Sequence, residues 1–245
     1  MNLKSVRVII FLFIIAIVSG NYSSSQIKFS IGPTIGYTGP MGDFGGTTID
    51  YYNGTKYGLN GGVNFGAQAK LKLLILNIKG SAAYTSLSNS GNSEPGQGSV
   101  ETNMKLLTFG LGTEFHLPLP LVPVNPYIGL ELLFTNFNGE TVFTGVARVP
   151  SGTYSMSSAS RTGLGIGAGV EISFGKKTSL DIGVKYNMYN LIGRSFSGGD
   201  DRIFSYTSLN DAADPQYSLD PDKHPVSSNR LISAFQFNLS FLFDF

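Results

Sequence analysis

The chain has 245 residues, enough for one domain or at most two. It contains 31 glycines and 12% aromatic residues, while charged residues reach only 13%, about half the usual share for a soluble domain. The formal net charge is +1 and becomes −1 when Lys4 and Arg7 are left out of the 17 basic residues, which argues against a nucleic acid as partner. Without cysteine the chain has no disulfide, no thiolate metal site and no residue for lipid attachment.

Residues 1–20 have the features of a secretory signal peptide. Lys4 and Arg7 come first, followed by an apolar run that ends at Val18 and by small residues. A single membrane-anchoring helix is the alternative, but the run is too short to cross roughly 30 Å of hydrocarbon. We expect cleavage between residues 20 and 26. The mean hydropathy of +0.09, and the lack of 18 consecutive apolar residues elsewhere, argue against a helical membrane bundle.

The mature domain, residues 27–245, contains eight segments in which large apolar side chains alternate with small or polar ones, as in a β-strand. We expect strands at residues 27–37, 59–71, 74–86, 103–117, 127–137, 162–174, 179–189 and 231–245. The apolar phase changes near Lys72 and Leu73, and we place the turn between the second and third strands there. Four prolines between residues 118 and 126 separate the fourth strand from the fifth, because proline cannot continue a ladder.

The connections between these segments alternate in length. Short ones follow the second, fourth and sixth strands, the last being a tight hairpin at residues 175–178. Long ones, about 15 to 40 residues, follow the first, third, fifth and seventh strands, as in barrels that have short periplasmic turns and long extracellular loops. We therefore expect an all-β fold, an eight-stranded antiparallel up-and-down transmembrane β-barrel in the outer membrane, with both termini on the periplasmic side.

Alternation does not decide which face is outside, because an eight-stranded soluble barrel of lipocalin type points its apolar side inward. Here the other face is mostly Gly, Ser, Thr and Asn, too small and too neutral for a soluble exterior, so we expect apolar side chains to face lipid. Side chains can fill an eight-stranded interior, and buried charges there need partners. We expect a plugged lumen of little conductance, with ion-pair candidates Lys28, Lys70, Lys79, Glu114, Glu131, Glu171, Asp181 and Lys185.

Four segments carry a resemblance to known proteins: residues 126–131, 165–171, 180–186 and the Phe-rich closing strand. With these strands placed, the chain resembles small outer-membrane β-barrels of the OmpA-transmembrane-like or OmpX-like group and the PorT or porin-family barrels of Bacteroidetes-like bacteria. Members serve as adhesins, stabilising barrels, secretion accessories or narrow channels. Phe241, Phe243 and Phe245 resemble the C-terminal signal for insertion of such barrels. The resemblance implies membrane lipid and the barrel-insertion machinery as partners.

Few residues suggest chemistry. Gly163, Gly165 and Ala168 fit a relaxed dinucleotide fingerprint, but they lie inside a strand and open no helix, so we interpret the glycines as lumen-facing. His116 is expected at the periplasmic end of the fourth strand, where a structural role is favoured. His224 lies in a loop with aspartates and serines, where a catalytic triad is conceivable.

The last long loop, residues 191–229, carries six aspartates against three basic residues. It could bind a divalent cation, but the spacing matches no EF-hand, and we favour a solvated loop. The segment 51–54, Tyr-Tyr-Asn-Gly, and the Ser- and Gly-rich loops after residues 87 and 140 have a composition suited to adhesive contacts, although variable loop filler is the simpler interpretation.

We expect a non-enzymatic outer-membrane barrel without catalytic residues, cofactor or metal, acting structurally or through its surface loops on an extracellular ligand. A narrow channel for small solutes is the alternative. A lipid-modifying barrel enzyme is a third hypothesis, and it would depend on His224.

Overall fold

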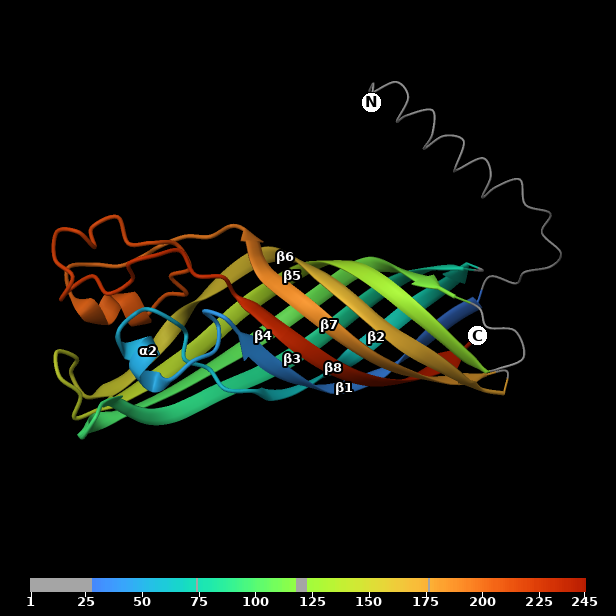
Figure 1. The fold of residues 1–245 in the computed structure, drawn as a ribbon, viewed down its shortest axis with the longest axis horizontal. Coiled ribbons are helices and arrows are strands. Elements are labelled where there is room, and N and C mark those ends of the chain that lie inside the picture. Colours follow the sequence, from blue (N-terminus) through green and yellow to red (C-terminus); the bar gives the residue numbers. More distant parts are fainter. Residues whose placement is uncertain (1–27, 74, 118–122, 176) are drawn as a thin grey trace, which may run out of the picture.

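The computed structural model describes residues 28–73, 75–117, 123–175 and 177–245. Eight antiparallel strands follow one another around a closed barrel, and β1 pairs with β8 (Figure 1). The strands are β1 (Lys28–Met41), β2 (Gly62–Leu73), β3 (Leu76–Glu94), β4 (Gln97–His116), β5 (Val124–Thr144), β6 (Gly152–Phe174), β7 (Thr178–Ile192) and β8 (Ser233–Asp244). A short helix α2 (Thr48–Tyr52) and a 3-10 turn η1 (Arg202–Tyr206) lie in the loops. This confirms the predicted eight-stranded barrel.

None of the helices within the described ranges is both long and apolar enough to span a bilayer.

The large apolar side chains of the strands point away from the barrel axis. On β8, Phe235 and Phe237 are 51% and 50% exposed, whereas their neighbours Ala234 and Gln236 are buried. The same alternation runs through the other strands, because successive residues of a strand face opposite sides of the sheet. The apolar side is therefore outside, as predicted, and the lipocalin-like arrangement does not occur.

Two of the predicted long loops are in fact strand. β3 runs to Glu94 and β4 begins at Gln97, so that only a tight turn joins them. In the same way β5 runs to Thr144 and β6 begins at Gly152, which leaves a short connection between these two strands. The prediction failed because these Ser-, Gly- and Asn-rich segments look like loops when read alone. Their strand character comes from pairing with each other and from inward apolar residues such as Val100, which is fully buried.

Two smaller boundaries also differ from the prediction. β2 continues through Lys72 to Leu73, which pairs with Leu76, so the turn lies beyond the predicted position. β5 begins at Val124 and includes Pro126, which pairs with Val170 of β6. The carbonyl oxygen of Pro126 accepts from the backbone N–H of Leu117 at 2.9 Å, so the side on which proline lacks an N–H faces β4. Pro126 is tolerated there because the register of β4 with β5 ends one residue earlier, at His116 and Tyr127.

The two ends of the barrel differ. The beginning of β1 and the end of β8 lie at one end, here called the terminal end (Figure 1). The β1–β2 loop (residues 42–61), which holds α2, and the β7–β8 loop (residues 193–232), which holds η1, lie together at the other, the loop end. A capping box fixes the start of α2: the backbone N–H of Asp50 donates to the Thr47 hydroxyl, and the Asp50 carboxylate accepts from the Thr47 N–H. That N–H holds the pKa of Asp50 below its ordinary value.

The predicted signal peptide, residues 1–20 with its cleavage region, lies outside the described residues and stays a prediction.

Candidate functional site

The most unusual part of the molecule is the interior of the barrel, where ionised side chains from seven strands meet. They lie on the inward faces of β2 to β8. Successive residues of a strand face opposite sides of the sheet, and the neighbours of these charged residues face outward. We call this group the ionic plug. It consists of Lys70, Lys72, Lys79, Glu114, Glu131, Glu171, Asp181, Lys185 and Asp244.

Near the terminal end, Lys72 bridges two carboxylates. Its Nζ lies 2.9 Å from Asp244 and 2.5 Å from Glu171. The Ser30 hydroxyl donates to the same Asp244 carboxylate at 2.5 Å. Glu171 in turn lies 3.5 Å from Nζ of Lys70, which is fully buried. The ion pairs thus continue from the end of the barrel into its interior.

In the middle of the barrel the signs of charge alternate along one continuous path. Nζ of Lys70 lies 2.7 Å from Glu114, Glu114 lies 3.1 Å from Lys79, and Lys79 lies 3.0 Å from Glu131. Lys185 completes the path at 2.9 Å from Glu131. Each of the two glutamates therefore lies between two ammonium groups, which offsets the cost of burying its charge.

Neutral side chains complete the ionic plug. The Asp181 carboxylate forms an ion pair with Lys70 and accepts from the Tyr127 hydroxyl at 2.7 Å and from the Gln68 amide at 3.2 Å. The Lys70 ammonium also lies 4.8 Å from the centre of the Tyr127 ring, within cation–π range. The plug is therefore a network held from several strands, since every charge except Lys185 has more than one partner.

The structure brings together every predicted ion-pair candidate except Lys28, which is exposed at the start of β1 and forms no ion pair with the described residues. Lys72 and Asp244 belong to the plug and were missed. Lys72 was placed in a turn, although the alternation of β2 continues through it. Asp244 lies on the polar face of the predicted last strand, so its position was already evident in the sequence.

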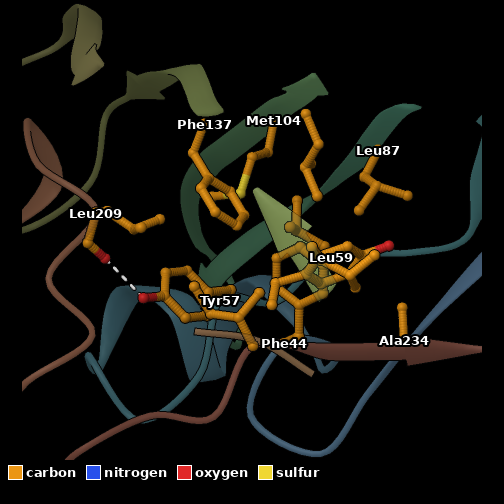
Figure 2. Close-up of a cluster of buried hydrophobic side chains, with 12 residues drawn as sticks. Phe44, Tyr57, Leu59, Leu87, Met104, Phe137, Leu209 and Ala234 are labelled. Atoms are coloured by element: carbon orange, nitrogen blue, oxygen red, sulfur yellow. Dashed lines mark hydrogen bonds between the residues drawn. The ribbon is translucent and has the colours of Figure 1, made fainter. Parts of the chain in front are cut away.

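On the loop side of the ionic plug, the lumen is filled with apolar side chains (Figure 2). Leu106 and Leu133 point inward from strands, whereas Phe44 and Tyr57 come from the β1–β2 loop and Leu209 from the β7–β8 loop. The Tyr57 hydroxyl donates to the carbonyl of Leu209 at 2.7 Å, so the two loops hold each other. We call this group the apolar plug; its buried members are Phe44, Tyr57, Leu59, Leu87, Met104, Leu106, Leu133, Phe137, Tyr189, Leu209, Ile232 and Ala234.

The apolar plug was not predicted, although the sequence contains a signal for it. Two adjacent leucines occur at 106–107 and again at 132–133, where strict alternation would place one polar residue. In each pair one leucine faces outward and the other is buried: Leu107 is 42% exposed, whereas Leu106 is not exposed at all. A strand apolar on both faces indicates that the barrel interior is itself apolar at that height.

A buried ion pair fastens the β7–β8 loop to the barrel. The Arg161 guanidinium donates to both carboxylate oxygens of Asp211, at 2.8 and 2.7 Å. Asp211 also accepts from the Asn190 amide at 3.0 Å and from the backbone N–H of Ser195 at 2.9 Å. Burial alone would raise the pKa of Asp211, but these donors outweigh it and hold the pKa below its ordinary value.

Two further arginines stack on loop tyrosines. The Arg230 guanidinium lies 4.1 Å from the centre of the Tyr57 ring and donates to the carbonyl of Asn210 at 3.0 Å. The Arg202 guanidinium lies 4.4 Å from the centre of the Tyr52 ring and donates to the Tyr52 carbonyl. These contacts join the β1–β2 and β7–β8 loops into one cap over the barrel mouth. Tyr51 and Tyr52 are buried in this cap, so these two residues of the segment 51–54 do not form the expected exposed adhesive surface.

Neither histidine forms a complete catalytic triad among the described residues. His116 is buried at the terminal end of β4, where Nε2 lies 3.1 Å from Glu114 and 2.8 Å from the Asn77 amide, and its ring stacks on Tyr127. His224 is also buried, with Nδ1 2.7 Å from Asp214. No serine within the described ranges hydrogen-bonds to His224.

The aspartates of the β7–β8 loop do not gather into a metal site. Among the residues that the structure describes, no three or more of His, Cys, Asp and Glu could hold an ion together. The interpretation as a solvated loop is wrong for Asp211 and Asp214, which are buried because Arg161 and His224 bind them. It suits Asp222, which forms an exposed pair with an arginine of the β5–β6 loop.

The glycine fingerprint lies within β6, and Gly163 and Gly165 are buried on its inward face. An added Cβ at Gly163 would lie 2.0 Å from the carbonyl oxygen of Met188, so glycine is needed there for close strand approach. This agrees with the interpretation of these residues as lumen-facing.

The phenylalanines of the proposed insertion signal lie at the terminal end. Phe241 and Phe243 are on the outer face of β8, with ring centres 5.1 Å apart. The backbone N–H of Phe245 donates to the carbonyl of Phe29 at 2.8 Å, and its ring is exposed. Their role as a signal stays a prediction.

A cavity beside the ionic plug has a volume of about 40 Å³ and is lined by Asn64, Gln68, Lys79, Tyr127 and Gln236 among others. Such a space accommodates a water molecule or two. It does not continue as an open pore, because the apolar plug closes the loop side.

An antiparallel eight-stranded barrel with apolar side chains outside and ion pairs inside is a transmembrane β-barrel. Over residues 9–210 the chain matches the family described as "Outer membrane protein beta-barrel domain", and it belongs to that family. No curated protein sequence matches the chain.

Several solved structures are similar in fold. Neisserial surface protein A is 14% identical, with 89% of this chain and 98% of that chain covered and a TM-score of 0.46. Ail, the attachment invasion locus protein of Yersinia pestis, is 12% identical, with coverages of 90% and 99% and a TM-score of 0.46. The N-terminal β-barrel domain of Pseudomonas aeruginosa OprF is 12% identical, with coverages of 90% and 98% and a TM-score of 0.40. At these identities and TM-scores no ligand or partner carries over to this chain.

Proposed function

We propose that this protein is a closed, non-enzymatic barrel of the bacterial outer membrane that acts structurally or through the surface of its loop end. The observation that carries the proposal is the double closure of the lumen, by the ionic plug and then by the apolar plug with its loop cap. A solute would have to displace buried ion pairs and a packed apolar cluster, which makes the narrow channel the weaker alternative.

The loop end faces the cell exterior in this proposal, and both termini face the periplasm. Barrels of this class place short turns on the periplasmic side and long loops outside. The partners are then membrane lipid around the apolar belt, the insertion machinery at the terminal end, and a ligand outside the cell.

The part of β5 and β6 that extends beyond the end of β7 supports a role in surface interaction. Toward the loop end, β6 stays paired with β5 as far as Gly152, whereas its pairing with β7 ends at Thr162. Residues 152–160 contain neither charge nor proline, the usual guards of an exposed edge. The N–H of Ser157, which points to this side, is bonded to the carbonyl of Thr207 in the β7–β8 loop. The free part of the edge, near Ser155, is suited to pairing with an extended peptide of a surface partner.

Two measurements test the proposal. Single-channel recording of the full chain in planar bilayers should give no steady conductance, and steady conductance would replace this function with the channel. The chain has no cysteine, so Ser155→Cys and Lys177→Cys introduce single thiols at the two ends. A membrane-impermeant maleimide should label the first on intact cells and the second only after permeabilisation. The reverse pattern contradicts the orientation.

A further inference from the structure

The outer surface of the barrel is hollowed where β7 leaves the sheet. β7 ends at Ile192, opposite Thr162 of β6, and Gly193 has a φ of 94° that turns the chain away. Because β6 continues without β7 beside it, a groove of about 360 Å³ opens at the fork. We call it the fork groove; its lining includes Leu107, Phe109, Phe134, Asn136, Thr162 and Ile192.

One part of the fork groove is apolar and continues the membrane-facing belt. Phe109 and Phe134 lie opposite each other on β4 and β5, and both are about half exposed. Ile192 forms the other wall and is 68% exposed. Because these residues share the outward face of a membrane-spanning barrel, the occupant that matches this part of the groove is an acyl chain.

The other part of the groove, toward the loop end, is polar. The Asn136 amide donates to the hydroxyls of Ser158 and Ser160 at 2.9 and 3.2 Å, and the Asn138 amide donates to the Asn136 oxygen at 3.0 Å. These exposed amide and hydroxyl groups keep further capacity to donate and accept. A head group with several hydroxyls matches them better than one without.

An exposed basic residue, Lys105, lies beside the polar part of the fork groove. Lys105 lies two residues from Leu107 on the same outward face of β4, and it pairs in register with Asn138. Its side chain is exposed and makes no ion pair within the described residues. The acidic residues Glu101 and Glu140 lie farther toward the loop end. Arg161 also lines the groove, but it is buried and paired with Asp211, so Lys105 is the exposed basic residue beside the groove that can take a further partner. A phosphate on the head group would complement it.

We propose that the fork groove binds one phosphorylated glycolipid of the outer leaflet. An acyl chain lies between Phe109 and Ile192, the sugar contacts Asn136 and its neighbours, and a phosphate lies near Lys105. The choice of the outer leaflet rests on the orientation proposed above. An ordinary phospholipid would fill the apolar part equally well but offers no sugar to the amide cluster.

The test uses the absence of tryptophan from the chain. Phe109→Trp places a single fluorophore in the groove, and Phe65→Trp places one at a similarly exposed site on β2 outside it. Both proteins are reconstituted in vesicles with a minor fraction of brominated lipid A, brominated phosphatidylethanolamine or brominated phosphatidylglycerol. Brominated lipid A should quench the groove tryptophan more than either phospholipid does, whereas all three should quench the control equally.

A charge variant tests the head-group assignment. Lys105→Gln in the Phe109→Trp protein should lower the preference for lipid A about fivefold, the factor that corresponds to one basic residue near a lipid surface. Lys177→Gln, at the terminal end, should leave it unchanged. Equal quenching by all three lipids at the groove, or an unaltered preference in Lys105→Gln, overturns the proposal. Both leaflets contain the same lipids, so the result does not depend on how the barrel is oriented or on whether it conducts.

Discussion

The guanidinium of Arg161 binds both carboxylate oxygens of Asp211, and this pair joins the end of the membrane-facing part of β6 to the middle of the β7–β8 loop. Asp211 is fully buried and takes two more donors, from Asn190 and Ser195. Ordering a loop of this length costs much conformational entropy, and a buried ion pair with further hydrogen bonds offsets part of that cost. The pair therefore decides whether the cap stays closed over the apolar plug.

Replacing Asp211 should open the cap. Asp211→Asn leaves the Arg161 charge buried without its partner, which we expect to cost about 3 kcal/mol in the free energy of loop opening. Hydrogen exchange of residues 193–232 should accelerate while the strands stay protected. The control is Asp222→Asn, which removes an exposed ion pair and should change little. Equal exchange in both variants would mean that the Arg161 pair does not hold the loop.

The same contact predicts a dependence on pH. The folded-state pKa of Asp211 is below the ordinary value of 3.8, so the carboxylate stabilises the cap fully above that pH. The contribution is lost as the pH falls from 3.8 through the lower folded-state value. Exchange in the β7–β8 loop, measured between pH 6 and pH 2 and corrected for the intrinsic rate, should stay constant above the ordinary pKa of 3.8 and rise as the pH falls below it. Asp211→Asn should lack this rise, and a rise of equal size in the variant contradicts the assignment.

The ionic plug should tolerate the loss of Lys79 poorly. Lys79→Ala removes the ammonium between Glu114 and Glu131, and we expect it to lower the free energy of unfolding by about 3 kcal/mol. Lys185→Ala is the matched control, because Lys185 pairs only with Glu131 and is more exposed, so its loss should be smaller. Urea unfolding from lipid vesicles, followed by tyrosine fluorescence, measures both. A larger loss for Lys185→Ala would contradict the central place of Lys79.

Close strand approach should make Gly163 irreplaceable. A Cβ there would lie 2.0 Å from the carbonyl oxygen of Met188, a backbone atom that cannot move aside cheaply. We expect Gly163→Ala to cost about 2 kcal/mol through overpacking. Gly80→Ala serves as the control, because no atom lies within 4 Å of its added Cβ. Thermal unfolding of the two variants compares them, and equal midpoints would show that the sheet adapts at Gly163.

The sequence alone determined the barrel, and the small, nearly neutral residues of the alternate face determined which side is outside. The alternation at Phe235, Phe237, Leu239 and Phe241 reports which face each residue takes, because the period of two is a local property of a strand. The inward charges followed from the same count, which is why Lys70 and Glu114 could be placed in the lumen without a structure. Lys72 was not predicted as a member of the ionic plug because the turn after the second strand was placed at residues 72–73, whereas β2 continues to Leu73.

Only the tertiary structure decided how the loop end is built. Ser- and Gly-rich residues such as those beyond Leu87 become strand because β4 pairs with them across a tight turn and β5 pairs with the other side of β4. The apolar plug depends on Phe44 and Leu209 meeting inside the barrel, although neither lies in a strand. The pairing of Arg161 with Asp211, 50 residues away, is equally non-local. Local periodicity records the direction of a side chain, whereas its partner is set by the closure of the barrel and the path of the loops over its mouth.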